Sequence, residues 1–396
     1  MTNTKPILIS GGGLASLLLA QALRLAKIPF KVFERDASFV FRAQGYRLRL
    51  SPEGLDAIES VLDAPTWDKF WAKCGKTGGA GFSAYDAVTG EQTEHRSPER
   101  LVSRDGKIVG IARGDMRAVF AEGCEDNIEW SKHVTGYELT PDGEGVHAIF
   151  ADGTKSVEGS MLIGGEGIHS KVARQLSKGK LKVYDTGARG LHGQAPSTAF
   201  KGLGEGVFRI LDNSRPDGHV FIITNIRSGD KDDPNVKFGW TMGGQPGVIR
   251  APNDDYTIVG KQAADIAKAL TKNWHPRFKP LFDEMDETDA AFWKITCSTP
   301  SGVPEWSNEP RVTVIGDAVH SMTPAGGIGA NTAVRDSALL EKLLREAGGY
   351  APDITAKYEK EMRVYGSEAV GQSYSMAVSS FGIKIDEETC DTVETA

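Results

Sequence analysis

Residues 311–331 read RVTVIGDAVHSMTPAGGIGAN, and this stretch decides the fold. Its first five residues are rich in valine and isoleucine, as in a buried strand, and the acid Asp317 comes soon after them. A glycine-rich loop then leads into an apolar-periodic helix, which we expect at 331–347. Backbone N–H groups at such a loop and helix start stabilise an anion. The stretch therefore predicts a binding site where a strand ends and a helix begins.

The start of the chain has a related pattern of strand, glycine turn, helix and strand. We expect these elements at 6–10, 11–13, 15–27 and 30–33. Gly11 permits the tight turn, Gly13 lets the backbone approach a pyrophosphate, and Glu34 is placed to accept hydrogen bonds from a ribose. Ser16 stands where a third glycine is usual. We interpret the unit as dinucleotide-binding, with a purely structural glycine turn as the alternative.

The amino-acid composition and net charge limit the kinds of molecule that this protein binds. The 396 residues are 40% hydrophobic and carry a net charge of −7, which is typical of a soluble globular chain with more than one ordinary domain. The acidic balance argues against nucleic acid or an anionic membrane as partner. We find no export signal and no apolar run long enough to span a membrane, so we expect a cytoplasmic protein of open oligomeric state. The four cysteines lack metal-ligand spacing, which predicts free thiols and no metal.

A third glycine stretch, LIGGEGIHS at 162–170, again runs from an apolar strand into a turn. Alone it would be an ordinary loop. Together, the three stretches resemble the class A FAD-dependent monooxygenases with the para-hydroxybenzoate hydroxylase fold, whose motifs occur in this order. The similarity covers roughly residues 6 to 375, and the segments FRAQG at 41–45 and DTGAR at 185–189 are most similar to fungal secondary-metabolism members.

The resemblance implies an α/β fold: a Rossmann-like FAD-binding domain with an inserted antiparallel-sheet substrate domain and C-terminal helices. We assign residues 1–74, 110–180 and 296–345 to the discontinuous FAD-binding domain, and 75–109 and 181–295 to the substrate-binding domain. The remainder, 346–396, would form C-terminal helices and an acidic tail that we expect to be frayed.

The resemblance also implies which residues contact FAD. Glu34 would hold the adenosine ribose, Arg42 and Arg113 would contact the pyrophosphate region, and Val134 would meet adenine through its backbone. Asp317 would bind the ribityl or pyrophosphate region. The full predicted set is Gly11, Gly13, Leu14, Ala15, Glu34, Arg35, Arg42, Arg113, Val134, Asp317, Pro324, Gly327, Gly329, Ala330 and Asn331.

Within that set, the loop of the third motif would serve the isoalloxazine ring. Pro324 would lie beside the ring. The N–H groups from Gly329 to Asn331 would face its pyrimidine edge and stabilise the negative charge of the reduced flavin.

The middle stretch departs from the family pattern at two positions. Glu166 stands where the family has Asp, and the usual Arg falls at Ala173, with Arg174 one place later. The family associates this motif with both the flavin and the nicotinamide, so the departures bear on NAD(P)H handling.

Outside these motifs, the sequence predicts a specific functional role for few residues. Phe221 and Trp240 lie in short strands of the substrate domain, where they either line an aromatic substrate cavity or form the core between domains. For His320, His192 and Arg189 a structural role is favoured over a chemical one. No catalytic acid or base can be named, because in this family the flavin carries the chemistry.

The sequence thus predicts an FAD-dependent monooxygenase. It would use NAD(P)H and O₂ to hydroxylate or epoxidise a small aromatic, indole-type or polyketide-derived substrate through a C4a-hydroperoxyflavin. Three alternatives stay open: a flavoprotein reductase or oxidase of the same fold without oxygen insertion, a non-catalytic ligand-sequestering protein, and a plain NAD-dependent dehydrogenase. The last would leave the stretch at 311–331 unexplained.

Overall fold

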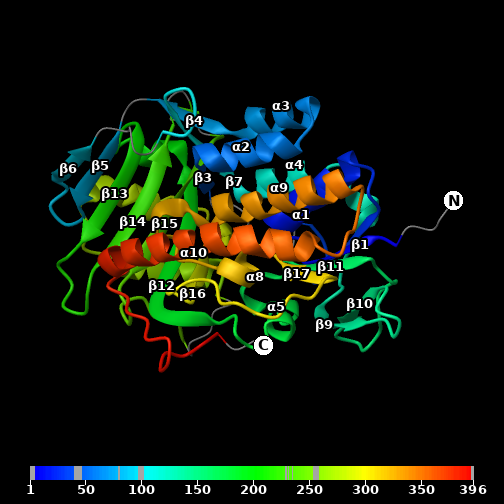
Figure 1. The fold of residues 1–396 in the computed structure, drawn as a ribbon. Coiled ribbons are helices and arrows are strands. Elements are labelled where there is room, and N and C mark those ends of the chain that lie inside the picture. Colours follow the sequence, from blue (N-terminus) through cyan, green and yellow to red (C-terminus); the bar gives the residue numbers. More distant parts are fainter. Residues whose placement is uncertain are drawn as a thin grey trace.

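The computed structural model describes residues 5–39, 47–78, 81–96, 102–227, 230, 232–233, 235–252 and 258–393. Two sheets of different kinds form its two halves, and the longest helices pack against the smaller sheet (Figure 1). The predicted Arg42 and the segment 41–45 lie outside the described residues.

The smaller sheet is parallel and has the strand order β17-β11-β1-β2-β8. Its strands are β1 (Ile7–Ser10), β2 (Phe30–Phe33), β8 (Ile128–Glu129), β11 (Met161–Gly164) and β17 (Val312–Val314). The strands β1 and β11 are buried at every position, as parallel strands covered on both faces are. All their carboxyl ends meet at one edge, where parallel α/β sheets bind ligands.

Helices surround this parallel sheet. They are α1 (Leu14–Leu25), α2 (Pro52–Val61), α3 (Ala64–Lys73), α4 (Arg113–Ala121), α5 (Lys171–Leu176), α8 (Asp317–His320), α9 (Gly329–Ala347) and α10 (Ile354–Phe381). Among them, α2 packs on α1 and α9, while α3 packs on α4. At the start of α2, the hydroxyl of Ser51 accepts the N–H of Gly54, and Pro52 stands at the first helical position. The helix expected at 331–347 begins two residues earlier, at Gly329.

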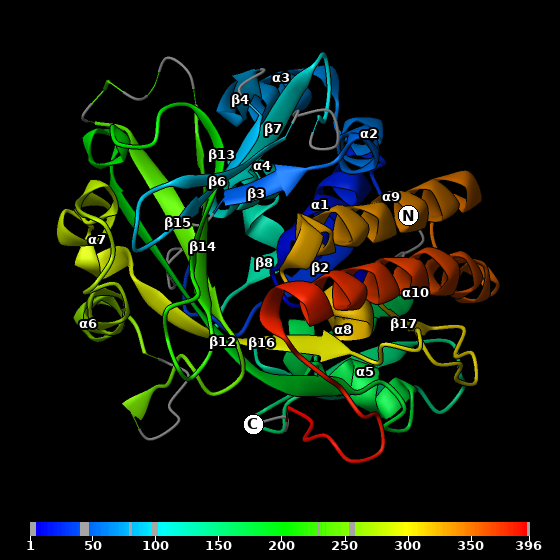
Figure 2. The same cartoon turned by 90° about the vertical axis from the view of Figure 1, so that its left-hand side faces the viewer.

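The larger sheet has seven strands in the order β16-β12-β15-β14-β13-β5-β6. Their bounds are β5 (Phe82–Asp86), β6 (Gln92–Arg96), β12 (Val183–Pro196), β13 (Gly206–Asp212), β14 (Val220–Ile226), β15 (Lys237–Gly244) and β16 (Ala291–Ser298). The helices α6 (Lys261–Leu270) and α7 (Pro280–Asp283) pack on its outer face (Figure 2). Its inner face is turned toward α10 and the parallel sheet.

Two small sheets complete the fold. A hairpin joins β9 (Val134–Leu139) to β10 (Val146–Phe150), and β3 (Arg47–Leu50), β7 (Lys107–Ala112) and β4 (Gly75–Gly78) form a three-stranded sheet. The predicted fold class, a Rossmann-like sheet with a largely antiparallel second sheet, is confirmed. The domain limits stay a prediction. Within the segment 75–109, β5 and β6 join the larger sheet, whereas β4 pairs with β7, which pairs in turn with β3.

The prediction of a frayed acidic tail is wrong for the residues up to 393. The N–H of Asp185 donates to the carbonyl of Asp391 at 3.0 Å, and the N–H of Val393 donates to the carbonyl of Val183 at 2.7 Å. The tail therefore pairs with the start of β12, where β15 does not reach. The charge of the segment predicted exposure, but the open strand edge that it covers is visible only in the fold.

Candidate functional site

A pocket of about 280 Å³ opens at the carboxyl edge of the parallel sheet. The residue directly after each of β1, β2 and β11 contributes to its wall, as do Ile315, Gly316 and Asp317 after β17. The pocket therefore joins the three glycine stretches, which are up to 300 residues apart in the sequence. The predicted site residues that line it are Gly11, Gly13, Leu14, Ala15, Glu34, Arg35, Arg113, Val134, Asp317, Gly329 and Ala330.

The first glycine turn is shaped by close backbone approach. Gly11 has φ +88°, and a Cβ there would collide with the carbonyl of Gly165, so only glycine fits the position. The turn places Gly13 as the N-cap of α1, whose first N–H groups face the pocket edge. Ser16 is accommodated because Gly165, which its hydroxyl approaches, has no side chain. The hydroxyl of Ser16, at the position of the usual third glycine, thus fits because the middle motif has glycine at residue 165.

Glu34 is buried at the end of β2, with 8% of its surface exposed. Its Oε2 accepts the N–H of Gly12 at 2.5 Å, and its Oε1 accepts the N–H of Asp36 at 2.9 Å. A carboxylate has about four lone-pair directions, so these two bonds leave acceptor capacity for a ligand hydroxyl. The turn and the acid therefore fix each other at the pocket wall.

Arg117 is a pocket residue that the sequence analysis missed. It lies one helical turn after Arg113 on α4, is 5% exposed, and donates from Nε to the carbonyl of Gly12 at 3.2 Å. The spacing of four residues on a helix was the signal that could have identified it. The pocket is also lined by Lys132, His133 and His169, which no sequence motif indicated. Together these side chains make part of the wall cationic.

Asp317 begins α8 at the bottom of the pocket. Its side chain is open to the pocket, yet the chain surrounds it deeply enough that burial raises its pKa, while His320 and Arg113 lower it. The preceding Gly316 has φ +61°, and its N–H donates to Oδ2 of Asp336 at 2.6 Å. The turn that presents Asp317 is therefore held from α9.

The side chain of Asn331 fastens the loop before α9 to β3. Asn331 donates from Nδ2 to the carbonyls of Arg49 at 3.0 Å and Gly327 at 2.9 Å, and its Oδ1 accepts the N–H of Ser51 at 2.8 Å. Two predicted residues at the start of α9, Gly329 and Ala330, line the pocket. The pocket lining does not include Pro324, Gly327 or Asn331. The loop thus extends the pocket toward β3.

The middle motif has a local structural role. Oε2 of Glu166 accepts the hydroxyl of Ser170 at 2.8 Å, and Ser170 in turn caps α5 by accepting the N–H of Ala173 at 3.0 Å. Burial raises the pKa of Glu166, and these hydrogen bonds oppose the shift. The side chain of Glu166, which is longer than the Asp of the family motif, is therefore directed at the start of α5 and also borders the pocket.

The two predicted substrate residues lie on opposite faces of the larger sheet. Trp240 is 1% exposed on the outer face, where it packs on Phe282 and donates from Nε1 to the carbonyl of Leu281 at 3.0 Å. Phe221 is on the inner face, with its ring 5.1 Å from that of Phe381 at the end of α10. The placement favours packing for Trp240 and leaves only Phe221 on the side of the pocket.

The residues given structural roles are held in tight contacts. Arg189 forms an ion pair with Asp185 at 2.6 Å, and His320 lies 2.8 Å from Asp336. For His192, burial lowers the pKa to about 4, so its ring is neutral at pH 7.

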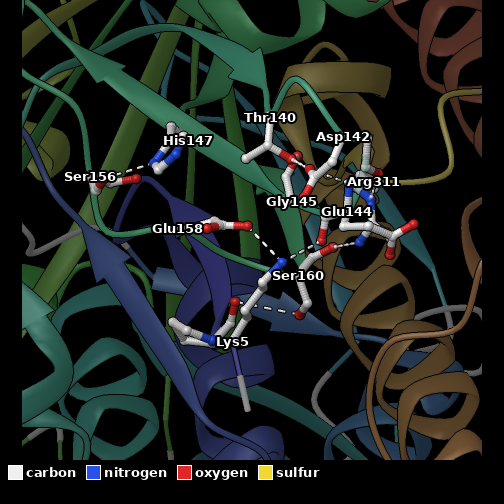
Figure 3. Close-up of polar contacts among 12 residues, drawn as sticks. Lys5, Thr140, Asp142, Glu144, Gly145, His147, Ser156, Glu158, Ser160 and Arg311 are labelled. Carbon is white, nitrogen blue, oxygen red and sulfur yellow. Dashed lines mark hydrogen bonds and ion pairs between the residues drawn. The ribbon is translucent and has the colours of Figure 1, made fainter. Parts of the chain in front are cut away.

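A second hollow, of about 460 Å³, lies at the opposite, amino edge of the parallel sheet. Arg311 donates there to the carbonyls of Gly143 and Ser160 and pairs with Glu144 at 3.0 Å, while Lys5 pairs with Glu158 at 2.6 Å (Figure 3). These contacts tie the β9–β10 hairpin to the strand starts. The hollow is therefore bordered by paired charges, and the site candidate is the pocket at the carboxyl edge.

Comparison with family models matches residues 116–373 to one described as an FAD binding domain. The curated relatives include the dual O-methyltransferase/FAD-dependent monooxygenase CTB3 of Cercospora beticola, 29% identical over 96% of this chain and 47% of the relative. They also include the FAD-dependent monooxygenase thnD of Trichoderma harzianum, 25% identical over 85% of this chain and 82% of the relative. The chain spans about half the length of the first relatives that it matches.

Solved structures share the fold. HpxO of Klebsiella pneumoniae, complexed with FAD and uric acid, superposes with a TM-score of 0.77 at 19% identity, over 96% of this chain and 90% of that one. The 2,6-dihydroxypyridine-3-hydroxylase of Arthrobacter nicotinovorans has a TM-score of 0.73 at 17% identity, over 100% of this chain and 98% of that one. In the part of the chain that the structure describes, no helix is both long and apolar enough to cross a membrane.

Proposed function

Because the chain belongs to the FAD binding domain family, we propose that it is an FAD-dependent monooxygenase that uses NAD(P)H and O₂ to oxygenate a small organic substrate. The observation that carries the proposal is the convergence of three glycine stretches, Glu34 and Asp317 on one pocket at the carboxyl edge of the parallel sheet. The relatives named as FAD-dependent monooxygenases support the choice of reaction.

The donor and acceptor groups of the pocket fit FAD. We assign the adenosine ribose to the remaining acceptor capacity of Glu34 and the pyrophosphate to the start of α1, with Arg113 and Arg117 from α4 beside it. The ribityl hydroxyls would reach Asp317. The collision that a Cβ at Gly11 would cause shows that backbone, rather than side chains, shapes this wall. FAD held here would supply the redox chemistry that couples NAD(P)H oxidation to insertion of one oxygen atom of O₂ into the substrate, the other atom being released as water.

The protein's own share in the reaction lies in the loop before α9. The N–H groups at the start of this 19-residue helix are directed at the end of the pocket lined by Gly329 and Ala330. Positive partial charge at a helix start favours an anionic ring over a neutral one. Asn331 keeps the loop in register with β3, so these donors are held in place before the flavin is reduced.

The inner face of the larger sheet is where we place the substrate. Ile223 lies on the interior strand β14 and is 43% exposed, which is unusual for a large apolar side chain inside a sheet. Its cross-strand partner on β15 is Thr241, which Gly239 and Gly243 flank on the same face. The rings of Phe381 and Phe221 fill the space over Gly243, so the open part of this face lies around Ile223 and Thr241. A small aromatic, indole-type or polyketide-derived substrate suits such a face.

The experiment is a screen of the FAD-loaded protein against aromatic and indole-type compounds, with NADPH and with NADH, under ¹⁸O₂. A compound that stimulates NAD(P)H oxidation should yield a product that carries one ¹⁸O atom. If stimulated oxidation yields only hydrogen peroxide with every compound, the protein is an oxidase or reductase of this fold. If neither nucleotide reduces the bound FAD, the enzyme assignment fails and ligand sequestration replaces it.

A further inference from the structure

Two arginine side chains converge at the junction between the small sheet β3-β7-β4 and the larger sheet. A Cβ added to Gly75 would collide with Nη1 of Arg227 and would stand 3.0 Å from Nη2 of Arg47. Arg47 begins β3, and Arg227 directly follows β14. The two guanidinium groups therefore face the same small space, which is open only because residue 75 has no side chain.

Among the described residues, one ion pair balances the two positive charges of this pair, while the charge of Asp115 also favours the protonated form of Arg47. Asp230 pairs with Arg227 at 2.8 Å, but the polar contact of Arg47 is the carbonyl of Gly110, at 3.0 Å. No carboxylate of the described residues forms an ion pair with Arg47, and Nε of Arg227 has no hydrogen-bond partner among them. Burial, and then the charge of Arg227, lower the pKa of Arg47 to about 10. Two largely buried like charges favour an anion placed between them.

The position of the pair relates it to the proposed substrate face. Arg227 continues the inner-face row of β14, two residues beyond Asn225 and four beyond the exposed Ile223. Arg47 shares a face of β3 with Arg49, whose Nη2 lies 3.3 Å from the carbonyl of Gly326 in the loop before α9. In Figure 2, β3 lies between the larger sheet and α9. The backbone positions of Arg47 and Arg49 are thus about 7 Å apart along β3, since a strand rises about 3.3 Å per residue.

We propose that Arg47 and Arg227 form an anion-binding subsite that holds an acidic group of the substrate, a carboxylate or an ionised phenol or enol. The inference rests on the proposed function and narrows it to an aromatic acid. The apolar body of the ligand lies over Ile223, near the flavin loop, and its charged end lies between the two guanidinium groups. Arginine suits this task because its planar fork matches a carboxylate and stays charged. The phosphate of NADPH has the same charge, but Phe221 and Ile223, on the same face of β14, offer an apolar surface that favours the substrate.

The test measures binding rather than turnover. Isothermal titration calorimetry of the FAD-loaded protein compares 2-naphthoate with the neutral 2-naphthamide, which has the same ring system. We expect the wild type to prefer the acid, and Arg47→Gln and Arg227→Gln each to weaken naphthoate binding by about tenfold or more with little effect on the amide. Arg227→Lys, which keeps the charge, should recover part of the affinity. Arg104→Gln is the matched control, because Arg104 pairs with Asp56 and Glu59 on the surface.

Three outcomes would overturn the proposal: equal binding of acid and amide by the wild type, no binding of either, or an unchanged preference in both glutamine variants. Titration with 2′-phospho-ADP-ribose separates the two sources of the anion. If the variants lose affinity for this fragment and not for naphthoate, the subsite serves the nucleotide. FAD content is measured in the same samples, so an unloaded protein points to failure of the proposed function instead.

Discussion

Nε2 of His320 lies 2.8 Å from Oδ2 of Asp336, and both side chains are fully buried. The same Oδ2 accepts the N–H of Gly316, and Oδ1 accepts the hydroxyl of Tyr365 at 2.6 Å. Asp336 on α9 therefore holds the turn that carries Asp317 at the pocket. The long motif at 311–331 thus depends on an acid that follows it by five residues.

Asp336→Ala should destabilise the protein by about 3 kcal/mol, because it leaves His320, Tyr365 and the N–H of Gly316 buried without their acceptor. Urea unfolding followed by circular dichroism measures the change. Glu341→Ala on the same helix is the matched control. Its partner Arg345 is 56% exposed, so the loss should stay below about 1 kcal/mol. Equal effects of the two substitutions would show that Asp336 has no special role.

Stability should fall as the pH rises above about 6.5, through the His320–Asp336 pair. Burial lowers the pKa of His320, but the charge and hydrogen bond of Asp336, together with the charge of Asp317, outweigh it, so the pKa lies above the ordinary 6.5. Since the folded pKa exceeds the unfolded one, the contribution is complete below pH 6.5 and is lost as pH rises through the folded pKa. The unfolding free energies of the wild type and of His320→Asn, measured across this range, should therefore converge. Parallel curves would contradict the assignment.

Arg113→Ala should weaken FAD retention, since Arg113 lies at the pocket at the start of α4 and its charge favours an ionised Asp317. Loss of one charge-assisted contact corresponds to about a tenfold rise in the FAD dissociation constant. Flavin fluorescence titration of the apoprotein measures it. Arg174→Ala, on α5 and outside the residues that line the pocket, is the control. An unchanged constant in Arg113→Ala would remove this residue from the site.

Reduction of the bound FAD by NADPH should be slow when no substrate is present, because Glu166 and Ala173 replace the residues that the family uses there. Glu166 accepts a hydrogen bond from Ser170 at the start of α5, which directs its carboxylate toward that helix. Anaerobic stopped-flow absorbance measures the rate. Fast reduction without substrate would show that both departures are harmless.

Much of the site followed from the sequence because glycine turns after apolar strands leave a local signal. Gly11 and Glu34 directly follow their strands, and Asp317 comes soon after β17, so spacing along the chain was enough. Side chains that reach the pocket from elsewhere carry no such signal. Arg117 was missed because nothing in its own segment marks it as a pocket residue, although it repeats Arg113 after one turn.

The larger sheet was harder to interpret, because alternation along a strand does not say which face is covered. Trp240 and Phe221 have similar sequence surroundings, yet α7 covers the first and the end of α10 meets the second. The pairing of Asp185 with the chain end at Asp391 likewise depends on an open strand edge that only the tertiary structure reveals. Arg47 and Arg227 meet across Gly75 from segments 180 residues apart.

The central claim is that the pocket at the carboxyl edge holds FAD with Asp317 at its floor. Its most direct test is the visible absorption spectrum of the purified wild type and of Asp317→Ala, followed by identification of the cofactor that heat releases. The account predicts a two-band flavin spectrum with released FAD for the wild type, and a mostly flavin-free variant. A colourless wild type that takes up no added FAD, or full flavin occupancy in Asp317→Ala, would contradict it.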